Sequence, residues 1–383
     1  MSRASTPPAA DPPDAGAVPP FVPHPWLRGP HAQTIFARLW PWPRARLAST
    51  YAEVDAGGGD FLSVLDSLPP GWKPGDPAAL LVHGLGGCAR SPYMVRVGRR
   101  LVGRLGIRVV RMNLRGAGSG FGRSRSYYHS GKTEDVRRVA AWLARRAPGS
   151  PITLIGFSLG ANLVLKLAGE AAEAPVDQLV GVVAANPPVD LEASCRAIQD
   201  PRNRIYDRNF VRLLRAEVSR LHARFPDLDP IDLTAAHSLL AFDEAYTAPR
   251  NGFRHARDYY QQSSAGPWIE RIRVPGLVVH ARDDPFIPPA ALDSISFPPS
   301  VRCEMIPQGG HLGFWSHRPW DGDRRWLDAR IVHWLARQHP TASPPHIPAR
   351  PPSQVIDPNH PPGSSPPCRA EPSRTSTEPP STS

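Results

Sequence analysis

The chain has 383 residues, long enough for one large α/β domain, and it carries 48 prolines and a formal net charge of +11. Its basic residues are scattered and, apart from Lys73, Lys132 and Lys166, they are all arginine, which indicates a coding bias and predicts no nucleic-acid partner. The four cysteines have no CxxC spacing and no paired histidines nearby, so the sequence predicts no metal, no redox centre and no cofactor.

The two ends of the chain differ from the middle in composition. Residues 1–20 and 340–383 consist mainly of Pro, Ser, Thr and Ala, with almost no large apolar side chains. Such segments bury too little apolar surface to offset the entropy of ordering, so we expect disordered tails on either side of a domain that spans residues 21–339. The first tail lacks the apolar core of a signal peptide, and no stretch approaches the roughly 20 apolar residues that span a bilayer. The sequence therefore predicts a cytoplasmic protein without a transmembrane segment.

Between the tails, short apolar runs alternate with patterns of helical period. The apolar runs predict strands at Ala78–Val82, Ile107–Met112, Ile152–Ile155, Leu179–Ala184, Gly276–His280 and Val301–Ile306. The helical patterns lie near 91–104 and 159–169, at Thr133–Arg146 with Thr133 as the expected N-cap, and at Arg324–Arg337. Strands separated by helices of this length form βαβ units, so the sequence predicts an α/β fold with a mostly parallel central sheet flanked by helices.

One interval is too long for a simple connection. About 90 residues separate the strand expected at Leu179–Ala184 from the one at Gly276–His280, whereas such connections usually take only a few residues. The interval contains its own amphipathic helix, whose apolar face is formed by Val211, Leu214, Val218, Leu221 and Phe225. We therefore expect a helical cap insertion over residues 187–265, above the end of the sheet that carries the active site.

The pentapeptide Gly156–Gly160 (GFSLG) follows an apolar strand and opens a helix. This context is the one that the nucleophile elbow of the α/β-hydrolase fold requires. The turn is so sharp that backbones approach closely, which glycine at its first and last positions permits. It lifts the hydroxyl of Ser158 above the sheet edge, beside the N-terminus of the next helix, where developing negative charge is favoured. Ser158 is therefore the predicted nucleophile.

A serine hydroxyl needs a base to remove its proton, and in this fold the partners follow in the order Ser, Asp, His. His311 is flanked by glycines on the loop after the strand expected at Val301–Ile306, which predicts a mobile imidazole that reaches the serine. The acid is one of two adjacent carboxylates on the preceding loop, Asp283 and Asp284. We favour Asp284, which stands four residues before Pro288, with Asp283 as a helper that hydrogen-bonds the loop.

An oxyanion hole completes a site of this kind. In this fold it uses one N–H from the residue after the nucleophile and one from the loop after the third strand. The corresponding amides belong to Leu159 and, in the segment His83–Gly87 (HGLGG), to Leu85. Because the donors are backbone groups, leucine is acceptable at both positions. Removing one such donor typically costs about 3 kcal/mol of transition-state stabilisation.

Segments spread along the chain resemble those of one known family. They are Pro20–Phe21, Pro25–Thr34 (PWLRGPHAQT), Asn113–Gly116 (NLRG), Tyr128–Gly131 (YHSG), Thr133–Asp135 (TED), Asn203–Asp207 (NRIYD), Phe242–Glu244 (FDE), Asp258–Tyr260 (DYY), Asp283–Phe286 (DDPF) and Gly310–Phe314 (GHLGF). Over residues 20–338 the chain resembles the YheT-like α/β hydrolases, which are related to the ABHD1/2/3 proteins and to plant embryogenesis-associated hydrolases. The chain departs from the family pattern at Ala117–Phe121, where a segment like Cys-Ser-Gly-Glu is usual, and at Ala161, where a second glycine is usual.

The resemblance implies that Ser158, Asp284 and His311 form a catalytic triad, and that the activity is that of an esterase or lipase on carboxylic esters. Together with the residue patterns, it predicts a serine hydrolase that forms an acyl-enzyme on Ser158. The expected partner is a small-molecule ester, lipid-like in some relatives. Two alternatives remain open at this point: an acyltransferase that uses the same triad, and a catalytically idle protein that holds lipid or a partner.

Overall fold

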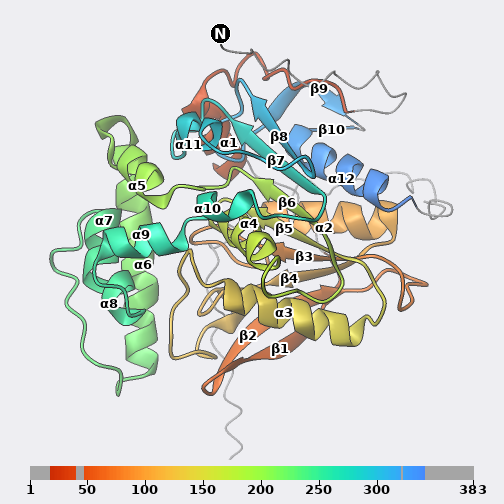
Figure 1. The fold of residues 1–383 in the computed structure, drawn as a ribbon. Helices are drawn as coiled ribbons and strands as arrows, with labels where there is room; N and C mark the ends of the chain where they lie inside the picture. The colour runs from red at the N-terminus through yellow and green to blue at the C-terminus, as the bar shows by residue number, and fades with distance from the viewer. Residues whose placement is uncertain (1–17, 40–46, 321, 341–383) are drawn as a thin grey trace, which may run out of the picture.

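The structure is a computed structural model that describes residues 18–39, 47–320 and 322–340 (Figure 1). The tails predicted at 1–20 and 340–383 therefore lie outside the described residues, except for 18–20 and 340. The strands are β1 (Thr50–Gly57), β2 (Asp60–Ser67), β3 (Ala78–Val82), β4 (Arg108–Met112), β5 (Ile152–Phe157), β6 (Leu179–Ala185), β7 (Gly276–Ala281), β8 (Val301–Ile306), β9 (Trp315–Trp320) and β10 (Asp323–Arg325).

The helices fall into two groups. One group accompanies the strands: α1 (Pro30–Leu39), α2 (Pro92–Leu105), η1 (Gly118–Gly120), α3 (Thr133–Arg146), α4 (Leu159–Glu170), α11 (Pro289–Asp293) and α12 (Trp326–Gln338). The other group is inserted between β6 and β7: α5 (Leu191–Gln199), η2 (Pro201–Asn203), α6 (Arg204–Arg224), α7 (Leu239–Phe242), the π-helical turn η3 (Asp243–Thr247), α8 (Ala248–Arg250), α9 (Ala256–Ser263) and α10 (Gly266–Ile269).

Eight strands form the main sheet in the order β1-β2-β4-β3-β5-β6-β7-β8. All neighbours from β4 to β8 pair in parallel, whereas β1 and β2 form an antiparallel hairpin at one edge. The hairpin is not among the predicted strands, although three consecutive glycines, Gly57–Gly59, mark its turn with positive φ angles. The parallel sheet, its flanking helices and the inserted helices confirm the predicted α/β-hydrolase fold.

The helix α3 spans Thr133–Arg146 as predicted, but its N-cap is Lys132, so the N-cap predicted at Thr133 is wrong by one residue. The start of the last helix is wrong by two residues. The last helix begins at Trp326, because the residues before it pair as β10 with β9.

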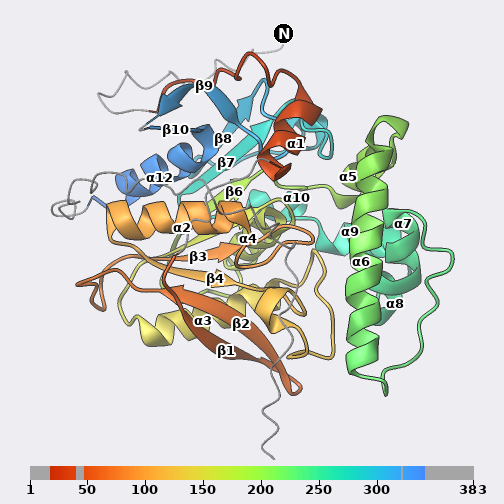
Figure 2. The ribbon, with the colours of Figure 1, turned by 180° about the vertical axis from the view of Figure 1, so that it is seen from behind.

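The core lies on both faces of the sheet, as the strand β3 illustrates. Leu80 and Val82 contact the cluster that includes α3 and α4, whereas Ala79 and Leu81 contact the cluster that includes α2 and α12. Figure 1 shows α3 and α4 in front of the sheet, and Figure 2 shows α2 and α12 on the opposite face. Because the parallel strands are buried on both faces, their sequences are continuous apolar runs.

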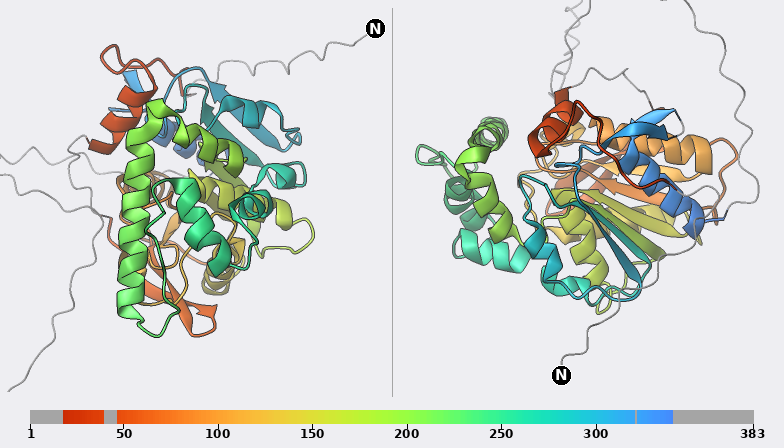
Figure 3. Two further views of the ribbon diagram at one scale, coloured as in Figure 1. Left: turned by 90° about the vertical axis from the view of Figure 1, so that its left-hand side faces the viewer. Right: turned by 90° about the horizontal axis from the view of Figure 1, so that it is seen from above.

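The inserted helices α5 to α9 form a cap at one side of the molecule, beyond the carboxyl ends of the central strands (Figure 1). Within the cap, α6 is the long helix that runs along the outer side (Figure 3, left). Its apolar stripe of Val211, Leu214, Val218 and Leu221 is buried, as the sequence pattern predicts. Within the described residues, no helix has the length and apolar character required to cross a bilayer.

Candidate active site

The turn from β5 into α4 places Ser158 in a backbone conformation that is rare for a residue with a side chain, with φ 53° and ψ −121°. A Cβ atom at Gly156 would lie 2.3 Å from the carbonyl oxygen of Gly160, and one at Gly160 would lie 2.3 Å from that of Val82. Both glycines are therefore required sterically. The turn packs tightly against itself and against the end of β3, and Ser158 and Leu159 line the pocket above it.

Three predicted residues from different strand ends meet above the sheet. The hydroxyl of Ser158 lies 2.9 Å from Nε2 of His311, and Nδ1 of His311 lies 2.7 Å from Oδ2 of Asp284. Because the Asp284 carboxylate accepts from Nδ1, the neutral ring presents Nε2 as an acceptor to the serine hydroxyl. Ser158 follows β5, Asp284 follows β7 and His311 follows β8, so parallel pairing brings the three loops to one edge.

Asp284 is buried and fully engaged in hydrogen bonds. Besides His311, its carboxylate accepts from the amide of Phe286 at 2.8 Å and from Nδ2 of Asn186 at 2.6 Å. Burial by itself would raise the pKa of Asp284, but the charge and hydrogen bond of His311 outweigh it, and the pKa lies below its usual value. Asp284 is therefore ionised at neutral pH and holds the imidazole in place.

The neighbouring Asp283 points to a different partner. Its Oδ1 accepts from the amide of Gly310 at 2.8 Å, which fixes the loop that carries His311. Burial raises the pKa of Asp283, as expected for a carboxyl with no cationic partner among the described residues. Asp283 thus hydrogen-bonds the loop, the helper position that its sequence context indicates.

Two residues that hold the site were not predicted from the residue patterns. Asn186 takes a positive φ of 46° directly after β6 and donates both to Asp284 and, at 3.3 Å, to the carbonyl of Gly310. Thr34 of α1 accepts the backbone amide of His311 at 2.8 Å. A polar residue at the carboxyl end of a buried parallel strand is a signal that would have found Asn186. Thr34 carries no local signal, because its role depends on where α1 packs.

The two predicted oxyanion donors lie on opposite sides of Ser158 in the chain and line the same pocket. Among the described residues, the amides of Leu85 and Leu159 have no hydrogen-bond acceptor. The amide of the next residue, Gly86, has a partner, because it donates to the hydroxyl of Tyr128 at 2.9 Å. Two residues with free backbone donors therefore line the pocket that Ser158 also lines.

A buried histidine fixes the loop after β3. Nδ1 of His83 donates to the carbonyl of Gly84 at 2.8 Å, and Nε2 accepts from the amide of Leu114 at 3.1 Å. Burial lowers the pKa of His83 to about 4, so the ring is neutral and can act as donor on one side and acceptor on the other. The loop that carries Leu85 is therefore held from below by a residue that does not itself line the pocket.

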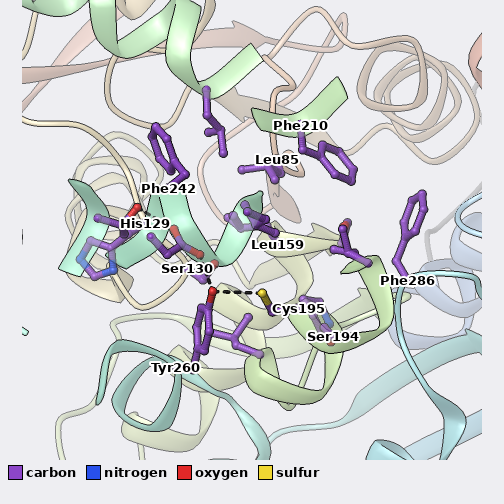
Figure 4. Close-up of a pocket in the computed structure, with 18 of the residues that line it drawn as sticks. Leu85, His129, Ser130, Leu159, Ser194, Cys195, Phe210, Phe242, Tyr260 and Phe286 are labelled. Carbon is purple, nitrogen blue, oxygen red and sulfur yellow. Dashed lines mark hydrogen bonds between the residues drawn. The ribbon is translucent and has the colours of Figure 1, made fainter. Parts of the chain in front are cut away.

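The pocket above Ser158 has a volume of about 100 Å³ and is lined mostly by apolar and aromatic side chains, many of which belong to the cap. Figure 4 shows Leu85 and Leu159 near its base, with Phe210 and Phe242 of the cap directed into the same space. The lining also includes Tyr127, Tyr128, His129, Ser130, Pro188, Leu191, Ser194, Cys195, Ile198, Leu214, Leu239, Asp243, Thr247, Tyr259, Tyr260, Phe286 and Ile287. Across the part of the chain that the structure describes, no group of His, Cys, Asp and Glu could hold a metal ion.

One wall of this pocket is polar. Oδ2 of Asp243 accepts from the hydroxyl of Tyr260 at 2.7 Å, and Oδ1 accepts from Thr247 at 2.7 Å. The Tyr260 hydroxyl also lies 3.2 Å from Sγ of Cys195 (Figure 4). Burial raises the pKa of Asp243 to about 6. These bonds join η3 to α5 and α9, so they tie three parts of the cap together.

Comparison with known proteins places this geometry in a family. The sequence model of the alpha/beta hydrolase fold matches residues 77–318. The YheT protein of Escherichia coli is 34% identical over 320 residues, which cover 82% of this chain and 92% of that protein. This chain belongs to the YheT-like α/β hydrolases. Membership makes it a hydrolase and confirms the resemblance on which the sequence analysis relied.

Two further proteins place this YheT-like hydrolase more broadly. The monoacylglycerol lipase of Saccharomyces cerevisiae is 27% identical over 272 residues, which cover 69% of this chain but only 60% of that protein. A solved structure of the Pyrococcus furiosus esterase Pf2001 has a TM-score of 0.51 and 16% sequence identity, covering 79% of this chain and 96% of that one. The second likeness shows a shared fold.

Proposed function

We propose that this YheT-like hydrolase cleaves carboxylic esters through an acyl-enzyme on Ser158. The observation that carries the proposal is the continuous series of hydrogen bonds from Ser158 through His311 to the buried carboxylate of Asp284. The strained turn at Ser158 supports it as well, because strain of this kind persists where it serves a function. No structural role requires a serine with this backbone at the base of a pocket.

In the first step, Ser158 Oγ attacks the ester carbonyl carbon while His311 Nε2 takes the hydroxyl proton. The carbonyl oxygen becomes an oxyanion, and the amides of Leu85 and Leu159 donate to it. Asp284 stabilises the resulting imidazolium without taking its proton. When the tetrahedral intermediate collapses, the bond to the alkoxy oxygen breaks and His311 protonates the departing alcohol.

The second step releases the acid. His311 removes a proton from a water molecule as its oxygen attacks the acyl carbon, and the same two amides hold the new oxyanion. Collapse breaks the bond to Ser158 Oγ, which recovers its proton from His311. The free carboxylic acid leaves and the enzyme returns to its starting state.

The pocket supports a substrate with an apolar part. Its walls are largely aromatic and aliphatic side chains of the cap, such as Phe210 and Phe242, which would bury an acyl chain. The yeast relative whose name states that it is a monoacylglycerol lipase supports the same class of substrate. We therefore propose a lipid-like ester as the substrate, with its acyl chain under the cap.

A serine-reactive fluorophosphonate probe and the Ser158→Ala variant test this proposal together. The wild-type chain should be labelled and should hydrolyse p-nitrophenyl esters, whereas the variant should do neither and should keep the wild-type melting temperature. Only the hydroxyl is lost, so the fold has no reason to change. Absence of labelling in the wild-type chain would instead favour a catalytically idle binding protein, and near-normal turnover by the variant would exclude Ser158 as the nucleophile.

A further inference from the structure

Exposed apolar and basic side chains lie on α1, on the turn that precedes it and on the neighbouring helix α6. Trp26 is 89% exposed, Ile205 is 70% exposed, and Ile35 on α1 is 39% exposed. Arg204, Arg208 and Arg212 are exposed at successive turns of α6. We call these six residues the docking face, and Figure 3 (left) looks onto α6 with α1 beside its upper end.

The two parts of the docking face are joined by direct contacts. The ring of His31 in α1 stacks on the ring of Tyr206 in α6, with centroids 5.7 Å apart, and its Nδ1 lies 3.0 Å from the tyrosine hydroxyl. The turn that carries Trp26 is tied to α1 as well, because Gln33 Nε2 donates to the carbonyl of Leu27 at 2.9 Å. The turn and the two helices that carry the docking face are therefore tied to one another.

The arginines of the docking face have no carboxylate partners. Among the described residues, no Asp or Glu forms an ion pair with Arg204, Arg208 or Arg212, and Arg212 donates instead to the side chain of Asn209. The acidic residue in this part of α6, Asp207, is buried and accepts the amide of Leu239. The basic stripe thus presents uncompensated positive charge to the surroundings.

We propose that the docking face binds the surface of an anionic lipid bilayer. Exposed tryptophan and isoleucine favour the boundary between headgroups and acyl chains, and adjacent arginines favour anionic headgroups. A surface that bound nucleic acid would need the charges alone and would gain nothing from exposed isoleucines. The combination of both kinds of side chain on these neighbouring elements points to lipid.

The docking face borders the active site. Thr34 on α1 accepts the amide of His311, and Phe210 on α6 lines the pocket above Ser158. Docking would therefore hold the pocket next to a source of lipid-like ester. That purpose rests on the proposed function, but binding to a bilayer is measured without any hydrolysis.

The test uses the full chain in vesicle flotation. The wild-type chain should float with vesicles of phosphatidylcholine mixed with phosphatidylglycerol, should float poorly with phosphatidylcholine alone, and should be released by added salt. The variant Arg204→Gln/Arg208→Gln/Arg212→Gln should lose about tenfold or more in affinity. The variant Arg99→Gln/Arg145→Gln/Arg273→Gln changes the net charge equally on other exposed surfaces and should bind nearly as well as wild type.

A second variant tests the contribution of the apolar side chains. Trp26→Ala/Ile205→Ala should weaken vesicle binding by about tenfold, because two large apolar side chains no longer enter the interface. All variants should hydrolyse the soluble ester p-nitrophenyl acetate at the wild-type rate, since none of these side chains lines the pocket. That readout also shows that each variant is folded.

The docking proposal would be overturned if the wild-type chain did not float, or if it floated equally with both kinds of vesicle. It would also be overturned if the control variant lost as much vesicle affinity as the α6 variant. A final contrary result would be arginine-dependent binding to duplex DNA without binding to vesicles. Failure of the proposed function would look different. The wild-type chain would then leave the soluble ester intact whatever it did with vesicles.

Discussion

Asp283 and Asp284 share a loop, yet each carboxylate serves a different neighbour. Asp284 is turned toward His311 and is buried among donors, whereas Asp283 accepts the amide of Gly310. The pKa of Asp284 is lowered by His311, and the pKa of Asp283 is raised by burial. The pKa values of two adjacent carboxyls thus shift in opposite directions because their surroundings differ.

This difference predicts how the two aspartates respond to mutation. Asp284→Asn removes the charge that fixes the imidazole tautomer and stabilises the imidazolium, so kcat should fall by about 10³-fold or more. Asp283→Asn keeps an acceptor for Gly310 and should cost less than about tenfold, the value of one ordinary hydrogen bond. Measuring kcat of both variants on one activated ester decides between them. A crippled Asp283→Asn beside a near-normal Asp284→Asn would reverse the assignment.

Substitution of Asn186 should reduce kcat less than substitution of Asp284. Its amide donates at 2.6 Å to the same carboxylate oxygen that faces His311, so it helps to hold Asp284 in position. Asn186→Gly removes that donor while glycine tolerates the φ of 46°. We expect kcat to fall about tenfold with KM unchanged, the cost of one charge-assisted hydrogen bond. An unchanged kcat would show that the Phe286 amide and His311 suffice to hold the carboxylate.

At the scale of elements, the turn between β5 and α4 is defined by how closely it approaches β3. The helix N-terminus lies against the carbonyl oxygens of Val82 and His83, which a Cβ at Gly160 would approach to 2.3 Å and 2.6 Å. These are backbone atoms of the last residue of the central strand β3 and of the buried residue that follows it. The turn therefore cannot relax without moving the sheet or Ser158.

Two glycine-to-alanine substitutions should consequently change the free energy of unfolding in opposite directions. Gly160→Ala should lower the free energy of unfolding by about 2 kcal/mol or more, because the overlap is with rigid backbone, and should abolish ester hydrolysis. Gly103→Ala lies in an exposed turn of α2 with no atom within 4 Å of the added Cβ. It should raise that free energy by about 0.5–1 kcal/mol. Urea unfolding of both variants measures this, and equal effects would contradict the steric account.

At the scale of the whole molecule, the first described residues bind the last helix of the domain. The carbonyl of Pro19 accepts from Nε1 of Trp326 at 2.6 Å. The ring of Phe21 meets the rings of Phe314 and Trp326 edge-on, at centroid distances of 5.6 Å and 5.8 Å. Pro23 pairs with Ser316 at the start of β9. The N-terminal segment therefore belongs to the packed domain from about Val18 onward.

Truncation should reveal this boundary. Removing residues 1–17 and 341–383, which are rich in proline and small polar residues, should change the melting temperature by no more than about 2 °C. Removing residues 1–22 should lower it by several degrees, because the partly buried ring of Phe21 and the hydrogen bond from Trp326 are lost. Thermal unfolding of both truncated chains checks the prediction. Equal melting temperatures of the two truncated chains would mean that the contacts of residues 18–22 add nothing to stability.

The sequence by itself determined the parts of this protein that depend on neighbouring residues. Apolar runs and helical periods predicted the strands β3 to β8 and the helices α2, α3, α4 and α6, because burial leaves a local pattern in the sequence. Gly156–Gly160 predicted the strained serine, because steric limits on a sharp turn act within a few residues. The hairpin of β1 and β2 was missed, since β1 is a partly exposed edge strand and polar residues interrupt the apolar residues of β2, so neither forms a continuous apolar run.

Only the tertiary structure decided which partners meet. Asp283 and Asp284 have nearly the same sequence context, and the path of the loop after β7 turns one toward His311 and the other toward Gly310. Asn186 reaches Asp284 across 98 positions, and Thr34 reaches the His311 amide across 277. Contacts of this range are set by strand order and by the packing of α1 on the finished sheet. No local pattern of residues encodes these contacts, because each depends on the relative positions of two segments that are far apart in the sequence.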